Sequence, residues 1–482
     1  MIPNTNAPTR NNFQINFFRY GRRGKNILLT TDHGGWVVLS EAEYLRILNY
    51  DIPEHLYDTL SSNGIILTED NINSIIEKYK TRYERFFGGT SLHLVIPTIR
   101  CNQSCVYCHS NAVNPLSIEK TMDQKTADRV LDFIFQSPSP DIIIEFQGGE
   151  SLMVFDCVKY VVSQAKKINE KIKKTLNFVI VTNLTLLKDD MIEFISKNKI
   201  KITTSLDGPR KLHNKNRQMF GGGDTYDHVI KNIEKLKKKG INVGMIMVTT
   251  RYSLSCWKEI IDEYIKHGQS DIRLGYIDYL GVARSTWNKI GYTIDEFLDF
   301  WKKSTDYIFS YHKKGVLLLE SNIDIILKKL YNSFDPNFLD LRSPCGIIIG
   351  QLAYNYNGDI YSCDEGRSDE YYLLGNVKKN DIGSVLRSRK AKLLVTSSIN
   401  ENYLCDACVY KPFCGLCPVL TRAVKNRLFT AVHHDNHCKR VKFMFDYVID
   451  KIINEPKDIK RLFLGIKLKN MLDSSLYRVV TR

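Results

Sequence analysis

Short apolar runs and amphipathic segments alternate through the middle of the chain. Runs typical of buried strands begin at Leu92, Asp141, Asn177, Lys201, Ile241 and Asp271. Helical spacing of apolar positions separates them, over 123–135, 156–169, 189–197, 225–239 and 255–267, and a further long helix is expected at about 295–314. Strands that alternate with helices predict right-handed βαβ units and a parallel sheet. We therefore expect an α/β fold with a partial (βα)6 barrel over residues 90–335, its active site at the carboxyl ends of the strands.

The first 85 residues have a different pattern and predict a small separate module. Apolar runs at 27–30 and 36–39 flank a turn, and Ser40 is a suitable N-cap for the helix expected after it. A second helix near 53–62 and a short strand at 65–67 complete a winged-helix-like unit. The sheet edge of such a unit can accept an extended peptide as an added strand. A purely structural cap on the next domain is the alternative.

The regular alternation ends near Pro344, and cysteine becomes frequent from there to Cys438. We assign residues 344–440 to a third, cysteine-rich domain. Residues 441–482 are expected to form a helical, basic tail.

Composition excludes several classes of protein. The chain is 43% hydrophobic and 25% charged, which is typical of globular proteins. It contains no apolar run near the roughly 20 residues that span a bilayer, and its polar N-terminus does not resemble a secretory signal. We expect a cytoplasmic protein without a membrane span. The net charge of +15 suits nucleic acid or another acidic partner, but the basic runs are also typical of solvated helix faces.

A group of three cysteines carries the first candidate chemistry. Cys101, Cys105 and Cys108 lie within eight residues, directly after the first expected barrel strand. Clustered thiols in a cytoplasmic protein bind metal more often than they form disulfides. Three thiolates can hold a cube of four irons and leave one iron without a protein ligand, which is the open position that chemistry requires. A structural zinc site or three unrelated thiols are the alternatives.

This arrangement resembles the radical S-adenosylmethionine (SAM) superfamily, and the resemblance covers about residues 90–440. It implies that Cys101, Cys105 and Cys108 hold a [4Fe-4S] cluster whose open iron binds the amino and carboxylate groups of SAM. In that family an electron from the cluster cleaves SAM to methionine and a 5′-deoxyadenosyl radical, which abstracts a hydrogen atom from the substrate.

Further positions match the family's cofactor-binding residues. Tyr107 corresponds to an aromatic residue beside the adenine. Gly148, Gly149 and Glu150 resemble the motif that holds the methionine ammonium group, although Ser151 follows where proline is usual.

The resemblance implies ribose and carboxylate contacts for polar groups at the ends of later strands, here Asn183 and Ser205. It matches Arg217 to an arginine that pairs with the methionine carboxylate. A helix cap or turn former is the alternative for Asn183 and Ser205, and a surface side chain for Arg217.

The later cysteines resemble the SPASM extension of peptide-modifying radical enzymes, which carries two auxiliary iron–sulfur clusters. The resemblance assigns four thiolates to an outer cluster: Cys405, Cys408, Cys414 and Cys438. It assigns three to an inner cluster: Cys345, Cys363 and Cys417. The inner cluster lacks one thiolate, and its open iron takes substrate, water or another side chain. The family has three residues inside the last close pair, whereas this chain has two, and zinc ribbons are the alternative.

Two cysteines fall outside these assignments, and one aspartate lies directly beside an assigned cysteine. Cys157 and Cys256 belong to neither pattern and are expected to be buried apolar thiols. Asp364 directly follows Cys363, where sulfatase-maturing relatives have an aspartate that acts as a base on the substrate. A salt bridge from Asp364 to Arg367 is the alternative.

The sequence as a whole resembles a peptide maturase, a radical enzyme that modifies a ribosomally made polypeptide. The B-type maturase of the His-Xaa-Ser system is the nearest likeness, carried by residues 17–20, 31–36, 352–358, 363–367 and 410–415. That likeness implies a protein partner with His-Xaa-Ser repeats and a second radical maturase, and the chemistry requires an external electron donor. A sulfatase-type, formylglycine-forming enzyme is the first alternative. An RNA-modifying radical enzyme and a purely structural metal scaffold are the others, and nucleic acid is the less favoured partner because no RNA-binding appendage is present.

Overall fold

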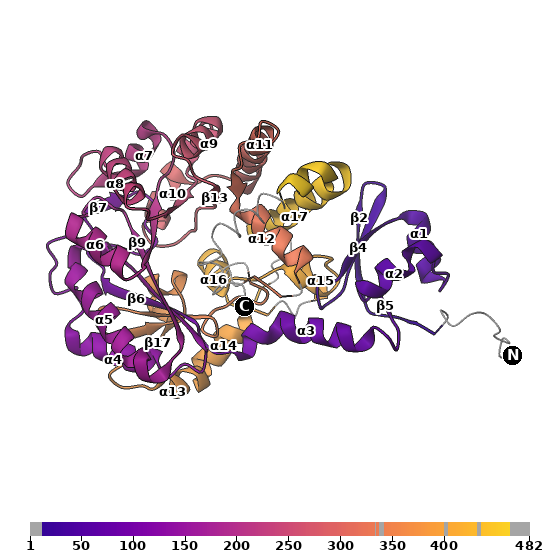
Figure 1. Cartoon of the computed structure of the whole chain (residues 1–482), viewed down its shortest axis with the longest axis horizontal. Helices are drawn as coiled ribbons and strands as arrows, with labels where there is room; N and C mark the ends of the chain where they lie inside the picture. Colours follow the sequence, from indigo (N-terminus) through magenta and orange to yellow (C-terminus); the bar gives the residue numbers. More distant parts are fainter. Residues whose placement is uncertain (1–11, 333, 337–341, 400–402, 431–434, 463–482) are drawn as a thin grey trace.

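The computed structural model describes residues 12–462 except 333, 337–341, 400–402 and 431–434. Within that part of the chain the main body is a strongly curved ten-stranded sheet with helices on its outer side (Figure 1). The strands follow the order β14-β13-β12-β10-β9-β8-β6-β15-β16-β17.

The predicted barrel strands are confirmed, and neighbours in this array run parallel. Their bounds are β6 Leu92–Thr98, β8 Asp141–Gly148, β9 Thr175–Thr182, β10 Lys201–Ser205, β12 Val243–Val248 and β13 Asp271–Gly275. The helices between them are α4 Gln124–Ile134, α5 Phe155–Ile172, α6 Asp189–Lys197, α7 Arg210–Asn216, α8 Tyr226–Lys238 and α9 Trp257–Lys266.

Alternation of burial along β8 shows which side chains enter the barrel. Ile142, Ile144 and Phe146 are fully buried in the core, whereas Glu145 and Gln147 are only partly buried. Because successive side chains point to opposite faces of a sheet, Glu145 and Gln147 lie on the other face, the concave side of the barrel.

Several elements after the barrel strands were not foreseen. They are the helices α10 Val282–Ile290 and α12 Ser321–Tyr331, and the short strand β14 Leu319–Glu320, which extends the sheet beside β13. The long helix expected near residue 295 is α11, Ile294–His312, which begins with a capping box between Thr293 and Glu296.

The cysteine-rich segment continues the barrel sheet. Its strands are β15 Gln351–Tyr354, β16 Asp359–Tyr361 and β17 Leu373–Asn376. β15 pairs in parallel with β6, with Gln351 opposite Leu92 and Tyr354 opposite Val95. The sheet therefore runs across the domain boundary expected near residue 344. An unclosed barrel leaves β6 with a free edge, and β15 satisfies its backbone groups.

The helices of this segment are α13 Ile382–Arg387, α14 Arg389–Ser397, α15 Tyr403–Asp406, α16 Pro418–Lys425 and α17 Asn436–Asn454. α17 begins at Asn436, so the tail expected from residue 441 starts inside this helix, and α17 packs on α11 and α12. Residues 463–482 of that tail lie outside the described residues. Among the described residues, no helix is long and apolar enough to cross a bilayer.

The N-terminal module lies at the opposite end of the molecule from the barrel (Figure 1). Three antiparallel strands are followed by three helices: β2 Arg19–Arg23, β3 Asn26–Thr30, β4 Trp36–Ser40, α1 Glu41–Leu48, α2 Glu54–Ser62 and α3 Ile72–Phe87. β1 Gln14–Ile15 pairs with β5 Ile66–Leu67. Ser40 caps α1 as predicted, through a capping box with Glu43. The module has a hydrophobic core of its own, which includes Ile27, Leu29 and Leu39.

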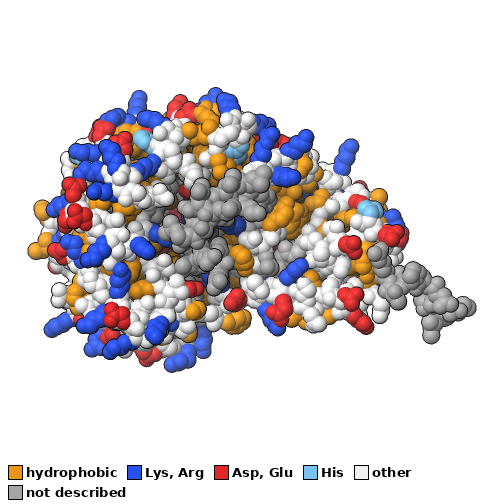
Figure 2. All heavy atoms as spheres, in the orientation of Figure 1, with side chains coloured by type: hydrophobic (Ala, Val, Ile, Leu, Met, Phe, Trp, Pro, Cys, Tyr) orange, Lys and Arg blue, Asp and Glu red, His pale blue; other side chains and the backbone are white. Residues whose placement is uncertain are grey.

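Charged side chains cover the visible face without gathering in one stripe, because blue and red side chains alternate over the barrel helices (Figure 2).

The expectation that two cysteines are buried differs from the structure. Cys157 and Cys256 are half-buried rather than buried, since each lies at the start of a barrel helix and only partly packs on the core.

Candidate functional site

The cysteine loop after β6 contains a short strand that pairs outside the barrel sheet. Cys101 is buried, and its sulfur accepts a hydrogen bond from the Gln103 backbone amide at 3.4 Å. β7, Gln103–Cys105, pairs antiparallel with β11, Arg217–Met219. The chain then turns, with the Cys108 amide donating to the Cys105 carbonyl at 3.2 Å. The three predicted cysteines are thereby brought to one side of the loop.

Burial disfavours the thiolate forms of the cysteines in this loop when no metal is bound. Burial raises the pKa of Cys101, and Glu150 and the neighbouring thiols raise it further. Burial likewise raises the pKa of Cys105 to about 12. Thiolates bind metal, and a metal deprotonates them outright, so this trio needs the positive charge that iron supplies. In the described part of the chain no three His, Cys, Asp or Glu side chains converge on a single ion. Each ligand of an iron–sulfur cube binds a different iron, so convergence is not required.

The two glycines at the end of β8 permit close contact with this loop. A Cβ atom on Gly148 would lie 2.2 Å from the Thr98 carbonyl, and one on Gly149 would lie 2.0 Å from the Arg100 carbonyl. The Gly149 and Glu150 amides donate to these same two carbonyls, at 3.0 and 2.7 Å. Glycine is therefore required here for strand–loop packing, whatever ligand the site holds.

Glu150 lies buried behind this contact. Its carboxylate accepts hydrogen bonds from the Leu152 amide, the Thr182 hydroxyl and the Asn183 amide at 2.6–2.9 Å. Burial nevertheless raises the pKa of Glu150, because these donors are neutral. A buried carboxylate of this kind favours a cation beside it, and the ammonium group of SAM would supply one.

Two of the predicted polar positions lie at the strand ends around the loop. The Asn183 side-chain amide donates to Asn102 Oδ1 at 2.9 Å and lies 3.9 Å from the Cys101 sulfur. Ser205 ends β10 half-buried, in register with Ile246 of β12. The structure thus joins Asn183 to the cysteine loop and places Ser205 one strand farther along.

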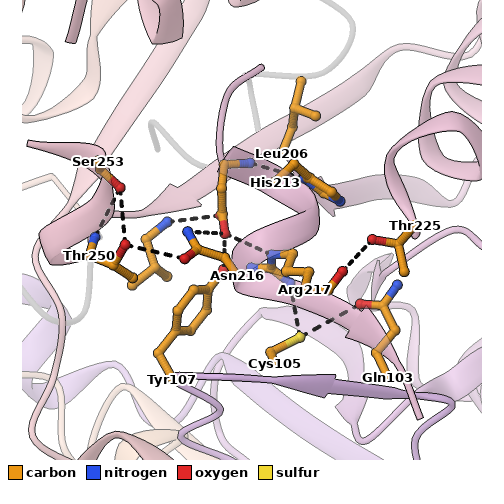
Figure 3. A network of polar contacts seen from close by, with 12 residues as sticks. Gln103, Cys105, Tyr107, Leu206, His213, Asn216, Arg217, Thr225, Thr250 and Ser253 are labelled. Atoms are coloured by element: carbon orange, nitrogen blue, oxygen red, sulfur yellow. Dashed lines mark hydrogen bonds and ion pairs between the residues drawn. The ribbon is translucent and has the colours of Figure 1, made fainter. Parts of the chain in front are cut away.

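Asp207 links several polar side chains and was not singled out by the sequence pattern; its partners Tyr107, Asn216 and Arg217 are labelled in Figure 3. Its fully buried carboxylate accepts from the Tyr107 hydroxyl at 2.5 Å, from the Asn216 side chain at 3.0 Å and from Arg217 Nε at 3.3 Å. The Arg217 guanidinium also lies 5.0 Å from the centre of the Tyr107 ring. Burial alone would lower the pKa of Arg217, but Asp207 outweighs it and raises that pKa. Tyr107 and Arg217, predicted separately, are therefore one network, and its signal was Asp207 two residues after a strand end.

The inner trio of cysteines is brought together beneath β15 and β16. Cys345, Cys363 and Cys417 are all buried, and the thiols of Cys345 and Cys417 are hydrogen-bonded. The Gly366 amide donates to the Cys363 sulfur at 3.3 Å. Burial raises the pKa of Cys363, and nearby Cys417 raises it further.

The outer four cysteines form a second group. Burial raises the pKa of Cys414 to about 12, and the neighbouring thiols Cys408, Cys405 and Cys438 raise it further, which shows that the four lie together. Neighbouring thiols thus act on Cys414 within one group and on Cys363 within the other, and the assignment of the two groups to two clusters stays a prediction.

Asp364 joins the two cysteine regions. Its carboxylate lies 2.6 Å from Arg367 Nε and 3.3 Å from His109 Nε2, and His109 directly follows Cys108. Burial would raise the pKa of Asp364, but Arg367 and His109 outweigh it and hold that pKa below its usual range. The salt bridge weighed as the alternative is present, and it lies beside the cysteine loop.

Glu145 is a second carboxylate near Asp364 that sequence reasoning missed. It lies on the concave face of β8, and Gln147 Nε2 donates to it at 2.5 Å. Burial raises the pKa of Glu145 to about 7, and the charge of Asp364 adds to the rise. Its position in the strand, two residues before Gln147, was the available signal.

A cavity of about 260 Å³ lies between the barrel and the cysteine-rich segment. His109 borders it from the side of the cysteine loop, and Cys414 and Cys417 border it from the side of the later cysteines. β12, β13, α12 and α17 supply the remaining walls, with charged groups that include Arg273, Lys329 and Arg440. One chamber therefore touches both cysteine regions.

Two family models match the chain. Residues 95–264 match the model of the radical SAM superfamily, and residues 345–409 match that of the SPASM iron-sulfur cluster-binding domain. An uncharacterized protein of Methanocaldococcus jannaschii is 30% identical over 296 residues, which cover 60% of this chain and 90% of that protein. The chain belongs to the radical SAM superfamily.

Other similar proteins share this fold. A cysteine-type anaerobic sulfatase-maturating enzyme of Clostridium perfringens is 24% identical over 371 residues, which cover 75% of this chain and 96% of that enzyme. The solved structure of native anSMEcpe with bound AdoMet has a TM-score of 0.66 at 20% identity and covers 76% of this chain and 100% of its own. The structure of Streptococcus suis SuiB bound to precursor peptide SuiA has a TM-score of 0.51 at 18% identity. The match covers 83% of this chain and 94% of SuiB.

Membership of the radical SAM superfamily makes this protein an enzyme that uses SAM and [4Fe-4S] clusters. When bound, the cluster and SAM together supply a carbon radical that removes a hydrogen atom from a substrate. The residues that would hold them are the loop cysteines for the first cluster, and Glu150, Asn183 and the Asp207 network for SAM. The buried thiol trio and the buried Glu150 carboxylate fit these groups chemically.

Proposed function

We propose that this radical SAM enzyme oxidises a side chain of a ribosomally made peptide or protein, as a maturase. The observation that carries the proposal is the chamber bordered by His109 on one side and by Cys414 and Cys417 on the other. A substrate side chain in this chamber lies between the site of hydrogen removal and the auxiliary clusters. The named relatives support it, since one is a sulfatase-maturating enzyme and SuiB is bound to a precursor peptide.

We assign the metal ligands as the sequence indicated. Cys101, Cys105 and Cys108 bind the first cluster, the outer four cysteines bind one auxiliary cluster, and the inner three bind the other. The inner cluster then keeps one iron without a thiolate. Cys417, an inner ligand, borders the chamber, so the inner cluster would lie beside the substrate region.

The protein's own side chains can accept the proton that leaves an oxidised substrate. Asp364 is the proposed base, and His109 at 3.3 Å can pass the proton on. Glu145, on the facing strand, is the second candidate, because a carboxyl group whose pKa is near 7 is well matched to proton transfer at neutral pH. Arg367 fixes Asp364 in place through its 2.6 Å contact.

The narrower proposal is a maturase of the His-Xaa-Ser type, acting beside a second radical maturase in the cytoplasm and reduced by an external electron donor. The N-terminal module supports it, because an exposed sheet edge can bind an extended peptide. The formylglycine-forming alternative is supported by Asp364, which occupies the position of the base in sulfatase maturases. Both act on a polypeptide, and the substrate distinguishes them.

The deciding experiment is anaerobic reconstitution with SAM, a reductant and two sets of peptides. One set comes from genes beside this one, including any with His-Xaa-Ser repeats, and the other contains the Cys or Ser motif of a sulfatase. Mass spectrometry of the peptides is the measurement. We expect loss of two hydrogen atoms from a neighbouring peptide and none from the sulfatase motif. Production of deoxyadenosine without change to any peptide would overturn the maturase proposal and leave the radical chemistry intact.

A further inference from the structure

The N-terminal module contacts the cysteine-rich domain along residues 405–414, which carry three of the four outer cysteines, and also through an ion pair of Arg23 with Asp446 of α17. Three module side chains each donate a hydrogen bond to a backbone carbonyl of this segment. The contacts are Arg19 Nε to Asp406 at 2.6 Å, Thr30 Oγ1 to Val409 at 2.7 Å and Arg82 Nη2 to Pro412 at 2.7 Å. The acceptors are spaced three residues apart, so the module follows the segment along its length.

The three donors are buried and fixed by the module itself. Arg19, Thr30 and Arg82 have exposed fractions of 5%, 0% and 3%. Arg19 is ion-paired with Asp32 at 2.6 Å, and Arg82 lies against Gly34, where even a Cβ atom would collide with the guanidinium. Loss of a buried donor leaves a carbonyl unsatisfied, which costs more than an exposed bond would.

Close packing accompanies these bonds. A Cβ atom on Gly21 of β2 would lie 3.0 Å from a methyl group of Val409. Arg23 Nε donates to the Tyr410 hydroxyl at 2.8 Å, and its guanidinium lies 5.1 Å from the centre of the Tyr410 ring. The module therefore packs directly on the segment between the cysteines.

The segment has little regular structure of its own. α15 ends at Asp406, and only a short 3-10 turn, Lys411–Phe413, precedes Cys414. An irregular segment pays a large entropic cost when it is fixed in one conformation, so ligands on it need support from outside.

We propose that the N-terminal module is a clamp for the outer auxiliary cluster, and that Arg19, Thr30 and Arg82 are positioning residues for its ligands. The proposal rests on the assignment of Cys405, Cys408, Cys414 and Cys438 to one cluster. It does not depend on which polypeptide is modified, so it can fail or succeed separately from the maturase proposal.

Charge adds to the clamp. The Arg82 guanidinium lies 5.1 Å from the centre of the Phe413 ring, next to Cys414 in the chain. Its Nε and Nη1 atoms are buried and have no hydrogen-bond acceptor among the described residues. A cube held by four thiolates is anionic, and a buried cation nearby stabilises it more strongly than it would in water. Arg82 thus donates to the backbone of the segment and brings a buried positive charge to Phe413, the neighbour of Cys414.

The test counts iron and measures how fast it is lost, without any substrate. Wild type, T30V, T30S, R82M and the double variant T30V/R82M are reconstituted anaerobically, desalted and challenged with an iron chelator. R22M is the matched control. Arg22 lies on β2, the strand that pairs with the β3 strand of Thr30, but it is exposed and pairs with Glu41. The SAM-induced change in the electron paramagnetic resonance signal reports the first cluster separately.

We expect about twelve irons per chain in wild type and R22M, and about eight in T30V/R82M, since one four-iron cube is lost. T30V should lose iron from one cluster about five-fold faster than wild type, and T30S should match wild type because it keeps the hydroxyl. The SAM-induced signal should persist throughout. Equal iron content and equal rates of iron loss in T30V/R82M and R22M would overturn the proposal that the N-terminal module supports the outer cluster. If the double variant does not fold, equal loss rates for T30V and T30S would overturn it.

Discussion

Arg217 lies directly opposite Cys105 in the short pairing of β7 with β11, and its Nη1 atom is 3.8 Å from the Cys105 sulfur. The same guanidinium pairs with Asp207 on its other side. One buried cation therefore connects the loop that would carry the first cluster to the Asp207 carboxylate that holds Tyr107. The ion pair with Asp207 therefore fixes the orientation of Arg217 beside the cysteine loop.

Arg217→Met should destabilise the protein by about 3–5 kcal/mol, because it leaves the buried Asp207 carboxylate without its cation. Denaturant unfolding of the reconstituted protein measures the change. Adding Asp207→Asn to the same chain should recover most of the loss, since no buried charge then remains unpaired. Equal stability of Arg217→Met and wild type would contradict the role of the pair.

Replacing Cys101, Cys105 or Cys108 by Ser should abolish deoxyadenosine production and remove about four of about twelve irons. Iron analysis and chromatography of the SAM products measure the two effects. Cys157→Ser is the control, since Cys157 is half-buried on α5 and away from every cysteine group, and it should keep both properties. Deoxyadenosine from any of the three loop variants would remove the basis of the cluster assignment.

Much of the barrel was predictable, because its strands bury one face in the core and read as short apolar runs between amphipathic helices. The cysteine loop was equally clear, since Cys101, Cys105 and Cys108 are close in sequence. Contacts between distant segments were not. Asp207 is one carboxylate among many in the sequence, and only the pairing of β7 with β11 places Arg217 beside it.

The cysteine-rich segment shows the same limit. Its ligand spacings were readable, but the pairing of β15 with β6 depends on a free sheet edge that no local pattern reveals. Glu145 was missed because a single acidic residue in an apolar strand gives no periodic signal. Its significance comes from Asp364, more than 200 positions later in the chain.

Gly149→Ala should prevent stable binding of the first cluster, because the new Cβ would lie 2.0 Å from the Arg100 carbonyl and push the cysteine loop away from β8. We expect loss of about four irons and of SAM cleavage. Gly88→Ala is the matched control, since the nearest atom to its added Cβ is 3.7 Å away and its φ is −76°. Normal iron content in Gly149→Ala would show that the loop can shift without cost.

Glu145→Gln should change how stability depends on pH. The pKa of Glu145 is raised from 4.5 to about 7, so its contribution is present below about pH 4.5 and is lost as the pH rises through 7. Denaturant unfolding at pH 5.5 and pH 8 should show a smaller decrease in the variant, by about 1–3 kcal/mol. An identical pH dependence in the two proteins would place Glu145 in a more solvated setting.

Asp364→Asn should separate hydrogen removal from proton removal. With a peptide that wild type modifies, we expect product formation to fall about 100-fold while deoxyadenosine formation continues, because general base catalysis typically contributes that much. Glu145→Gln tested in parallel identifies the base: the larger loss belongs to the carboxylate that takes the proton. Unchanged product formation in both variants would exclude Asp364 and Glu145 as the general base.

The pairing of β15 with β6 also bears on how the polypeptide is made. β6 is synthesised early, but the strand that completes its outer side emerges from the ribosome only after the whole barrel. During that interval the nascent chain exposes an apolar edge of the kind that recruits other strands and aggregates. A fragment that ends near residue 335 would keep this edge unpaired. We therefore expect the barrel to aggregate when it is expressed without the C-terminal third of the chain.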